Sequence, residues 1–507
     1  YLHIGGVRTA LFNWLFARRH GGQFILRIDD TDAQRNLSEA LQPILNGFRW
    51  LGIDWDEGPD VDGPYAPYYQ SQRLEQYQAA VTTLVERGAA YHDYATPEEI
   101  QQERQAAEQS KTSYTYSRRW MAETPEERAR FESEGRQAVV RLKMPREGTL
   151  ELNDLIRGQV SFEWQREQDH VIQRADGSCL YHLATVVDDH DFQITHVIRA
   201  EEHLSNTPRQ VFIAQSLGYE LPQFAHIPFV AEPGSRTKLS KRKLDSYRKN
   251  RDFAALCELG ETIAQSIGLQ ISAETFNPVI VDFYQQVGFL PHAVVNYLLL
   301  LGWSLDDRTE HFTAEEMINN FSLERVNKAP ASFDPQKLLA FQAYEMQKLS
   351  LDEKLAAASP FAERAGWFAA AANLGAPDRV RQIVAAAGDR LVVGGDILQY
   401  PEFFVADNQL TYDEKAFDKR LRKPEDAARL LQEFRAVLAD ETEFTAARLE
   451  QRLKDWVAEQ GIALGQVIHA LRVAVTGKSV GFGMFESLEI LGRESVLARI
   501  DAAMARV

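Results

Sequence analysis

The chain has 507 residues, of which 45% are hydrophobic and 25% charged, and this composition excludes disordered and fibrous proteins and predicts about three globular domains. The net charge of −17 excludes a protein that coats nucleic acid through its overall charge, although not one with a local basic surface. Apolar stretches such as residues 293–301 are shorter than the roughly 18 to 20 residues of a membrane span, so we expect no membrane partner.

Cysteine content and the first residue bear on cellular location. Cys179 and Cys257 are the only cysteines, and two thiols cannot build a disulfide framework or a four-thiolate metal site. We therefore expect a reducing compartment, the cytoplasm. The chain begins with Tyr1 rather than Met, directly before its first motif, and we expect the natural N-terminus to lie upstream.

The first elements follow the pattern of a helix and a strand of an α/β sheet. Apolar side chains recur along one helical face in residues 7–19, and Gly21 predicts the end of that helix. Residues 24–28, FILRI, predict a short buried strand that ends at Asp29. Open α/β sheets bind ligands at the C-terminal ends of their strands, which makes Asp29 a candidate site residue.

An inserted unit and a second strand and helix follow. Residues 97–137 are rich in Gln, Glu, Arg and Ala and predict solvated helices, whereas residues 138–169 alternate apolar and polar side chains as strands do. We therefore predict an inserted α+β unit over residues 86–185. Residues 194–198 predict the next strand, and Pro208 marks the first turn of the helix after it.

The rest of the chain, beyond about residue 243, is predicted to be almost entirely helical. Apolar side chains recur with helical spacing in residues 291–301, 313–321, 378–387, 425–438 and 445–459. The sequence contains no internal repeat and no low-complexity segment.

The first candidate motif is His3-Ile4-Gly5-Gly6. It opens the first predicted helix and so places an imidazole and two glycines at a positive helix N-terminus, where phosphates bind. Gly5 and Gly6 would let a nucleotide approach closely, and His3 could donate to a phosphoryl oxygen in the transition state. The alternative is a plain turn at the start of a helix.

The second candidate motif is KLSKR, residues 238–242, which follows a predicted apolar strand at residues 227–230. Eight of the sixteen residues from 236 to 251 are Lys or Arg, so positive charge is concentrated here in an otherwise acidic chain. Ammonium groups on such a loop can stabilise the charge that develops on leaving pyrophosphate. The alternative is a solvated basic loop or a nonspecific RNA-facing surface.

The two motifs together resemble the signature pair of class I aminoacyl-tRNA synthetases, in which HIGH-like and KMSKS-like sequences flank ATP. An inserted domain between the two halves of the catalytic domain is also typical of that class. Further segments resemble bacterial glutamyl-tRNA synthetases, and the resemblance covers nearly the whole chain: RIDDTD at 27–32, WLGIDWDEGP at 50–59, YYQSQR at 68–73 and YHLATVVDDHDFQITHVIRAEEHLSNTPRQ at 181–210.

The resemblance implies an α/β fold with a Rossmann-like class I synthetase catalytic domain and an α+β insertion, followed by all-α stem-contact and anticodon-binding domains. On this basis we predict a catalytic domain in two halves, residues 1–85 and 186–245, with an inserted acceptor-end-binding domain at residues 86–185 between them. A stem-contact domain at residues 246–330 and an anticodon-binding domain at residues 331–507 follow. Over residues 250–282 this chain has roughly 30 residues more than the family pattern. Loops usually tolerate an excess of this size.

An ATP site, with ATP bound as its Mg2+ complex, is also implied by the resemblance. It gives catalytic roles to His3 and to Lys241, the latter as a phosphate-binding lysine. Glu202 corresponds to a position near the ATP ribose, and the backbone of Val230 to one that faces adenine. The implied ATP-binding set is His3, Gly5, Gly6, Glu202, Val230, Lys238, Lys241 and Arg242.

Asp29, Tyr181 and Arg199 correspond to family positions that contact glutamate. A guanidinium at the end of a strand can bind a carboxylate bidentately, whereas neutral glutamine would leave that charge unpaired, so Arg199 predicts rejection of glutamine. Asp29 stands where the family usually has Glu, and its carboxylate is shorter by one methylene. The alternatives are an ion pair between Arg199 and Glu201 or Glu202, and a half-buried core position for Tyr181.

Two features found in the family are missing from the sequence. A strand just before the HIGH-like motif contacts the amino acid in the family, and the chain begins after that position. Some relatives hold zinc in the inserted domain, but the corresponding region from Tyr91 to Tyr94 has no cysteine, so we predict no zinc and no other resident metal.

The function implied by the resemblance is ATP-dependent ligation of L-glutamate to tRNA(Glu) by a monomer. Glutaminyl-tRNA synthetase is a close alternative, but its anticodon domains are β-barrels, whereas residues 378–459 have helical periodicity. Two further alternatives stay open: a nondiscriminating glutamyl-tRNA synthetase that also charges tRNA(Gln), and a noncatalytic tRNA-binding relative.

Overall fold

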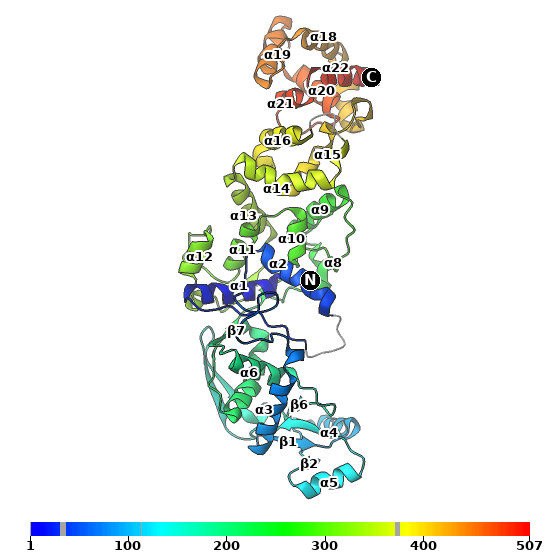
Figure 1. The fold of residues 1–507 in the computed structure, drawn as a ribbon. Helices are drawn as coiled ribbons and strands as arrows, with labels where there is room; N and C mark the ends of the chain where they lie inside the picture. The colour runs from blue at the N-terminus through cyan, green and yellow to red at the C-terminus, as the bar shows by residue number, and fades with distance from the viewer. Residues whose placement is uncertain (1, 31–36, 113, 371–375) are drawn as a thin grey trace. The chain divides into compact units, whose positions relative to one another are not determined.

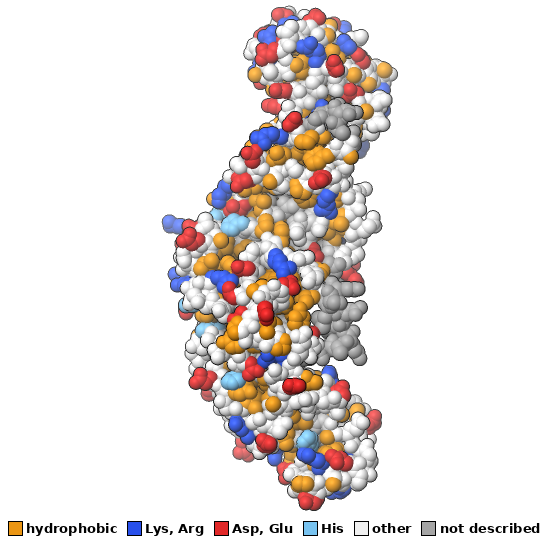
Figure 2. Space-filling model, in the orientation of Figure 1, with side chains coloured by type: hydrophobic (Ala, Val, Ile, Leu, Met, Phe, Trp, Pro, Cys, Tyr) orange, Lys and Arg blue, Asp and Glu red, His pale blue; other side chains and the backbone are white. Residues whose placement is uncertain are grey.

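The chain divides into two compact units, residues 1–240 with 298–333 (unit 1) and residues 241–297 with 334–507 (unit 2). The structure, a computed structural model, describes residues 2–30, 37–112, 114–370 and 376–507, so the end of the RIDDTD segment lies outside the described residues. No described helix is long and apolar enough to cross a membrane. Acidic and basic side chains lie interspersed on the face drawn in Figure 2. The predicted division into four domains stays a prediction.

The predicted first helix is confirmed as α1 (Ile4–Arg19), which begins three residues earlier than its apolar periodicity indicates. His3 is its N-cap, and its side chain accepts a hydrogen bond from the Gly5 amide. Val7, Leu11, Phe12 and Leu15 of this helix are fully buried, and Gly21 adopts a positive φ of 62° just after the helix, as a chain reversal there requires. The next two helices of unit 1 along the chain are α2 (Leu37–Trp50) and α3 (Leu74–Glu86).

The predicted buried strand at residues 24–28 is only partly correct. Ile25 and Ile28 form isolated parallel bridges, with Glu57 and Tyr69 respectively, and the side chains of residues 24–28 are half-buried. Apart from a local hydrogen bond from the Asp30 amide to the Ile28 carbonyl, the described backbone partners of this segment come from residues 56–70. A strand of a parallel sheet is buried when neighbours cover both sides, and pairing on one side explains the partial exposure.

The inserted region is an α+β unit, as predicted. Its four-stranded antiparallel sheet has the strand order β2-β1-β3-β6, and β4 and β5 form a separate hairpin. α4 and α5 lie beside this sheet (Figure 1), and each begins with a threonine capping box. The bounds are β1 Ala90–Asp93, α4 Pro97–Gln109, β2 Met121–Ala122, α5 Pro125–Ser133, β3 Val139–Leu142, β4 Thr149–Asp154, β5 Gly158–Glu163, β6 Val171–Gln173 and α6 Tyr181–Asp191.

A parallel β–α–β unit follows, which consists of β7 (His196–Ala200), α7 (Thr207–Leu217) and β8 (Gln223–Ile227). β7 lies two residues later than predicted. The strand predicted at 227–230 is wrong, because β8 ends at Ile227 and a separate short strand, β9 (Val230–Ala231), pairs with β10 (Ala331–Ser332). α12 (Ala314–Asn320) also belongs to unit 1.

Unit 2 is helical in its described residues, and the predicted helices there are confirmed (Figure 1). Residues 250–282 include the helix α9, which buries Phe253, Leu256 and Ile263 and contacts α10 and α13. The bounds are α8 Leu244–Tyr247, α9 Arg251–Ser266, α10 Val281–Val287, α13 Pro335–Lys348, α14 Leu351–Arg364, α15 Trp367–Ala370, α16 Ala376–Ala387, α17 Glu414–Phe417, α18 Ala427–Asp440, α19 Ala446–Gln460, α20 Gly465–Thr476, α21 Met484–Leu491 and α22 Arg493–Met504. α11 (Pro291–Leu300) spans the boundary between the units.

Candidate functional site

Two pockets of unit 1 contain the predicted site residues of that unit. The first has a volume of about 400 Å3 and the second about 900 Å3. Arg199 and His203 line both pockets, so the two cavities adjoin at these side chains. Such volumes suit a nucleotide or a small organic substrate.

The smaller pocket lies at the N-terminus of α1. His3 Nδ1 accepts a hydrogen bond of 2.9 Å from the Gly5 amide. A neutral His3 ring therefore carries its proton on Nε2, which can donate to a phosphate oxygen. His3 therefore caps the helix, as the simpler alternative predicted. It also lines the pocket, and the other predicted residues in this lining are Gly5, Gly6, Glu202, Val230 and Lys238.

The two glycines of the motif differ in their surroundings. A Cβ atom added to Gly5 would lie 3.2 Å from His3 Nδ1 and would press on the helix cap, whereas one added to Gly6 would meet nothing within 4 Å. Gly6 therefore faces open space in the pocket. The amide groups at this helix end, with the positive end of the helix dipole, provide an anion-binding surface.

Glu202 and Lys238 form an ion pair with each other at the pocket's edge, and both side chains are about half exposed. Val230 also lines the pocket, and its carbonyl accepts a hydrogen bond of 2.8 Å from the Leu239 amide. Leu239 is buried, which anchors the first part of the predicted loop. Lys238 is thus held within reach of the pocket.

Lys241 and Arg242 belong to unit 2, where they lie in a short 3-10 helix, Lys241–Lys243. Burial lowers the pKa of Lys241, and the nearby carboxylate of Asp282 at the start of α10 opposes that change. Their assignment to the ATP site stays a prediction.

The larger pocket contains Asp29, Tyr181 and Arg199, the three predicted glutamate contacts. Asp29 is paired with Arg27, whose Nε lies 2.7 Å from the Asp29 carboxylate. Arg27 Nη1 also lies 2.9 Å from Asp189, a second carboxylate in the lining of this pocket. Burial raises the pKa of Asp189, although Arg27 opposes this effect. With two carboxylates for one guanidinium, this end of the pocket is suited to an ammonium group.

Arg199 lies in β7, and the hydrogen-bond partners of its guanidinium are neutral. Its Nη1 donates to Gln210 Oε1 at 2.6 Å, its Nη2 to Thr207 Oγ1 at 2.9 Å and its Nε to His226 Nε2 at 3.1 Å. The suggested pairing with Glu201 or Glu202 is wrong, because every partner of this guanidinium within the described residues is neutral. Burial lowers the pKa of Arg199, as expected for a cation without a paired carboxylate.

The sequence interpretation missed several residues of the larger pocket. Arg27 and Asp189 lie in quoted motifs, RIDDTD and VVDDHDF, yet their pairing across the fold has no local signal. Thr185 also lines the pocket, four residues after Tyr181 and so on the same face of α6. The buried Thr185 hydroxyl has no hydrogen-bond partner among the described residues, which makes it a candidate substrate contact.

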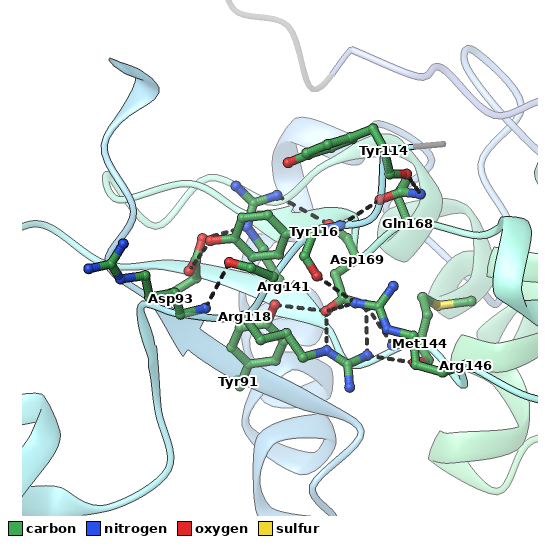
Figure 3. Close-up of polar contacts among 12 residues, drawn as sticks. Tyr91, Asp93, Tyr114, Tyr116, Arg118, Arg141, Met144, Arg146, Gln168 and Asp169 are labelled. Atoms are coloured by element: carbon green, nitrogen blue, oxygen red, sulfur yellow. Dashed lines mark hydrogen bonds and ion pairs between the residues drawn. The ribbon is translucent and has the colours of Figure 1, made fainter. Parts of the chain in front are cut away.

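The region considered for zinc holds a buried network of ion pairs and hydrogen bonds instead (Figure 3). Asp93 accepts from Tyr116 at 2.6 Å and from Arg141 at 2.5 Å. Asp169 accepts from Arg118 at 2.6 Å and from Tyr91 at 2.8 Å. Among the described residues no three His, Cys, Asp or Glu side chains gather as a metal site requires, so the residues present do not fit zinc.

Models of two protein families match the chain. The first is described as "tRNA synthetases class I (E and Q), catalytic domain" and matches residues 1–271 and 274–340. The second is described as "Anticodon binding domain" and matches residues 356–504. The catalytic-domain match includes most of residues 250–282.

Individual relatives agree with the family models. The chain is 42% identical to a glutamate–tRNA ligase of Moorella thermoacetica, over 99% of this chain and 95% of the relative, and 41% identical to glutamate–tRNA ligase 2 of Rubrobacter xylanophilus, over 100% and 95%. A crystal structure of a glutamate tRNA ligase from Elizabethkingia meningosepticum, in complex with its amino acid, matches with a TM-score of 0.83 at 30% identity, over 99% of this chain and 97% of the other. By these matches, the chain belongs to the glutamate–tRNA ligases, a family of class I aminoacyl-tRNA synthetases.

Proposed function

We propose that this chain ligates L-glutamate to tRNA(Glu) in two steps, with the two pockets of unit 1 as its substrate sites. In the first step the α-carboxylate of glutamate attacks the α-phosphorus of ATP, the α–β phosphoanhydride bond breaks, and glutamyl-adenylate and pyrophosphate form. In the second step a ribose hydroxyl of the 3′-terminal adenosine of tRNA attacks the carbonyl carbon of glutamyl-adenylate, an ester bond to the tRNA forms, the acyl–phosphate bond breaks, and AMP leaves. Positioning and charge stabilisation suffice for both steps, so no covalent protein nucleophile is needed.

The smaller pocket is proposed to bind ATP. The Nε2 proton of His3 and the amides at the start of α1 would contact phosphate oxygens, and the open space at Gly6 would admit the nucleotide. Lys238, Lys241 and Arg242 would supply positive charge to the leaving pyrophosphate, and Mg2+ would accompany ATP as part of the substrate complex.

The larger pocket is proposed to bind glutamate, and the neutral surroundings of Arg199 are the observation that supports this most. A buried guanidinium whose described partners are all neutral stabilises an incoming carboxylate more than one already paired with Asp or Glu. The Asp29 and Asp189 carboxylates would face the substrate ammonium, and Tyr181 would add a hydroxyl contact. Glutamine would leave Arg199 without a counter-charge, which predicts its rejection.

The partners and setting follow from the same proposal. The inserted unit at residues 86–185 would meet the acceptor end of tRNA, and the helices after residue 331 would receive the anticodon loop. We propose a monomer of the cytoplasm that uses no zinc. The side chains of the Asp93 and Asp169 network are engaged with one another, which supports the proposal of a zinc-free inserted unit.

The test is aminoacylation of purified tRNA(Glu) and tRNA(Gln), each with glutamate and with glutamine, by the protein expressed with any residues that precede Tyr1 in its gene. We expect glutamate on tRNA(Glu) and no glutamine on either tRNA. Glutamate on both tRNAs would identify a nondiscriminating enzyme. The absence of charging, with retained tRNA binding, would overturn the proposal in favour of a noncatalytic tRNA-binding protein.

A further inference from the structure

A line of hydrogen bonds runs from the inserted hairpin to the glutamate pocket. Asp154, the last residue of β4, lies 2.6 Å from Nδ1 of His226 in β8, and Nε2 of His226 accepts from Arg199 Nε at 3.1 Å. The Asp154 and His226 side chains are completely buried. Neither residue lines either pocket, so both act on a substrate only through Arg199.

The chemistry of the two partners fixes the state of the His226 ring. An ionised carboxylate only accepts hydrogen bonds, so His226 Nδ1 must carry a proton toward Asp154. A guanidinium only donates, so His226 Nε2 must be unprotonated toward Arg199. The ring is therefore neutral and held in its Nδ1–H tautomer.

Asp154 is well held in its ionised form. Its Oδ1 accepts from the amides of Ile156, Arg157 and His226 at 3.0, 2.8 and 3.2 Å. Burial acts to raise the pKa of Asp154, but the hydrogen bonds from His226 and from these amides outweigh burial and lower it. These three amides also leave Oδ2 as the oxygen that faces the His226 ring.

The same contacts orient the Arg199 guanidinium without neutralising it. A guanidinium has five N–H donors, and three of them are directed at His226, Gln210 and Thr207, which come from β8 and α7. Three neutral contacts fix the plane of the fork, and Tyr181, which lines the same pocket, interacts with the guanidinium as well. Loss of the Nε contact would let the fork rotate away from a bidentate geometry.

We propose that Asp154 and His226 are positioning residues that aim the Arg199 fork at the side-chain carboxylate of the substrate and thereby set the preference for glutamate over glutamine. This inference rests on the proposed function. It also gives the inserted unit a role in amino-acid selection, because Asp154 belongs to the β4–β5 hairpin and lies 72 residues before His226 in the chain.

The decisive variant is Asp154→Asn. The three backbone amides require an oxygen at the Oδ1 position, so the new amide nitrogen must face His226 and donate to its Nδ1. His226 must then adopt the Nε2–H tautomer and present a donor to the Arg199 donor, a reversal that this substitution is known to produce beside a histidine. We expect the KM for glutamate to rise by about tenfold or more, with kcat and the KM for ATP within about threefold of the wild type.

A second pair of variants keeps the proposal testable if Asp154→Asn does not fold. His226→Asn retains a group at the Nδ1 position for Asp154 but offers nothing to Arg199, whereas His226→Gln can reach both partners with its amide. We expect a rise of about tenfold in the glutamate KM for His226→Asn and a value within about threefold of the wild type for His226→Gln. Asp54→Asn, at an exposed carboxylate that also pairs with an arginine in unit 1, is the matched control and should leave the glutamate KM unchanged.

The outcomes separate this inference from the proposed function. Wild-type protein that charges glutamate, with a folded Asp154→Asn whose glutamate KM is unchanged, would overturn the positioning role alone. Equal increases in the KM values for glutamate and ATP would indicate general damage and would also overturn it, as would indistinguishable Asn and Gln variants at His226. Wild-type protein that charges no amino acid would overturn both proposals.

Discussion

Two regions of unit 1 bury arginine in opposite ways. In the inserted unit, Arg118 and Arg141 each meet a buried carboxylate, Asp169 and Asp93 respectively, as Figure 3 shows. The pKa of Arg118 is raised, mainly by its hydrogen bond to Asp169. Burial acts to lower the pKa of Arg141, but the contact with Asp93 outweighs burial, and this pKa is raised as well. In the larger pocket of unit 1, Arg199 has neutral hydrogen-bond partners, and burial lowers its pKa.

The difference separates a structural cation from a binding one. An arginine paired with a carboxylate stabilises the fold once the pair is formed, and removal of either partner leaves an uncompensated buried charge. An arginine held by neutral groups retains its charge for a ligand, at some cost to the stability of the free protein. The predictions below test whether the two regions respond to substitution as this distinction requires.

The largest effect is expected for Asp169→Ala in the inserted unit. This change leaves the Arg118 guanidinium unpaired and removes the acceptor of the Tyr91 hydroxyl and the Met144 amide. Loss of one partner of a buried ion pair costs about 3–5 kcal/mol in the free energy of unfolding. Urea unfolding measures this cost, with Asp176→Ala at an exposed loop as the control. A cost below about 1 kcal/mol would show that the network is not structural.

Lys241→Ala should act on catalysis rather than on stability. If Lys241 stabilises the leaving pyrophosphate, its loss removes on the order of 3 kcal/mol of transition-state stabilisation and lowers kcat by roughly 10² to 10³. Lys249→Ala removes the same charge from the same basic segment and is the matched control. Steady-state aminoacylation and urea unfolding measure the two effects. A decrease in kcat of less than about threefold would contradict the assignment of Lys241.

Gly6→Ala should separate ATP binding from folding. Apart from its chain neighbours and the backbone of its own helix, the added methyl group meets no protein atom within 4 Å, and alanine favours a helix over glycine by about 0.5–1 kcal/mol, so the melting temperature should not fall. The methyl group projects into the pocket, and we expect the KM for ATP to rise by about tenfold. Pyrophosphate exchange in the presence of tRNA measures this effect. An unchanged KM would place ATP elsewhere.

The smallest effect is a dependence of stability on pH in the acid range. Burial lowers the pKa of His170 and of His182 to about 4, and the nearby charge of Arg209 adds to this effect. The unfolded protein therefore binds protons more readily than the folded protein between about pH 6.5 and pH 4. Stability should be complete above that window and decline as the pH falls through it. Urea midpoints at several pH values measure the decline, and a variant with His170→Asn and His182→Asn should reduce it.

The elements that could be predicted are those with a strong local signal. Amphipathic helices such as α18 (Ala427–Asp440) were recognised to within about two residues, because one face repeats with helical spacing over several turns. The segment at residues 24–28 was predicted as fully buried because composition does not show how many neighbours a strand has. The helix α9 falls in the region beyond residue 243 that the sequence predicts to be almost entirely helical, but the sequence analysis gives no bounds for it.

The site was predictable where a side chain lies in a motif. The structure brings His3, Glu202 and Lys238 together in the lining of one pocket and Tyr181 and Arg199 in the lining of the other. The contacts that orient the Arg199 guanidinium without neutralising it could not be predicted. Asp154 and His226 are 72 residues apart in the chain, and neither gives a local signal in its own strand. Pairing of this kind arises only in the folded protein.

The central claim is that the charge of Arg199 serves the substrate carboxylate, and the most direct test compares glutamate and glutamine charging by the wild type and by Arg199→Gln. The account predicts that the variant loses about 10² to 10³ in kcat/KM for glutamate, the value of two charge-assisted hydrogen bonds, while its urea midpoint stays near that of the wild type. A folded variant that charges glutamate within about threefold of the wild type would contradict the claim.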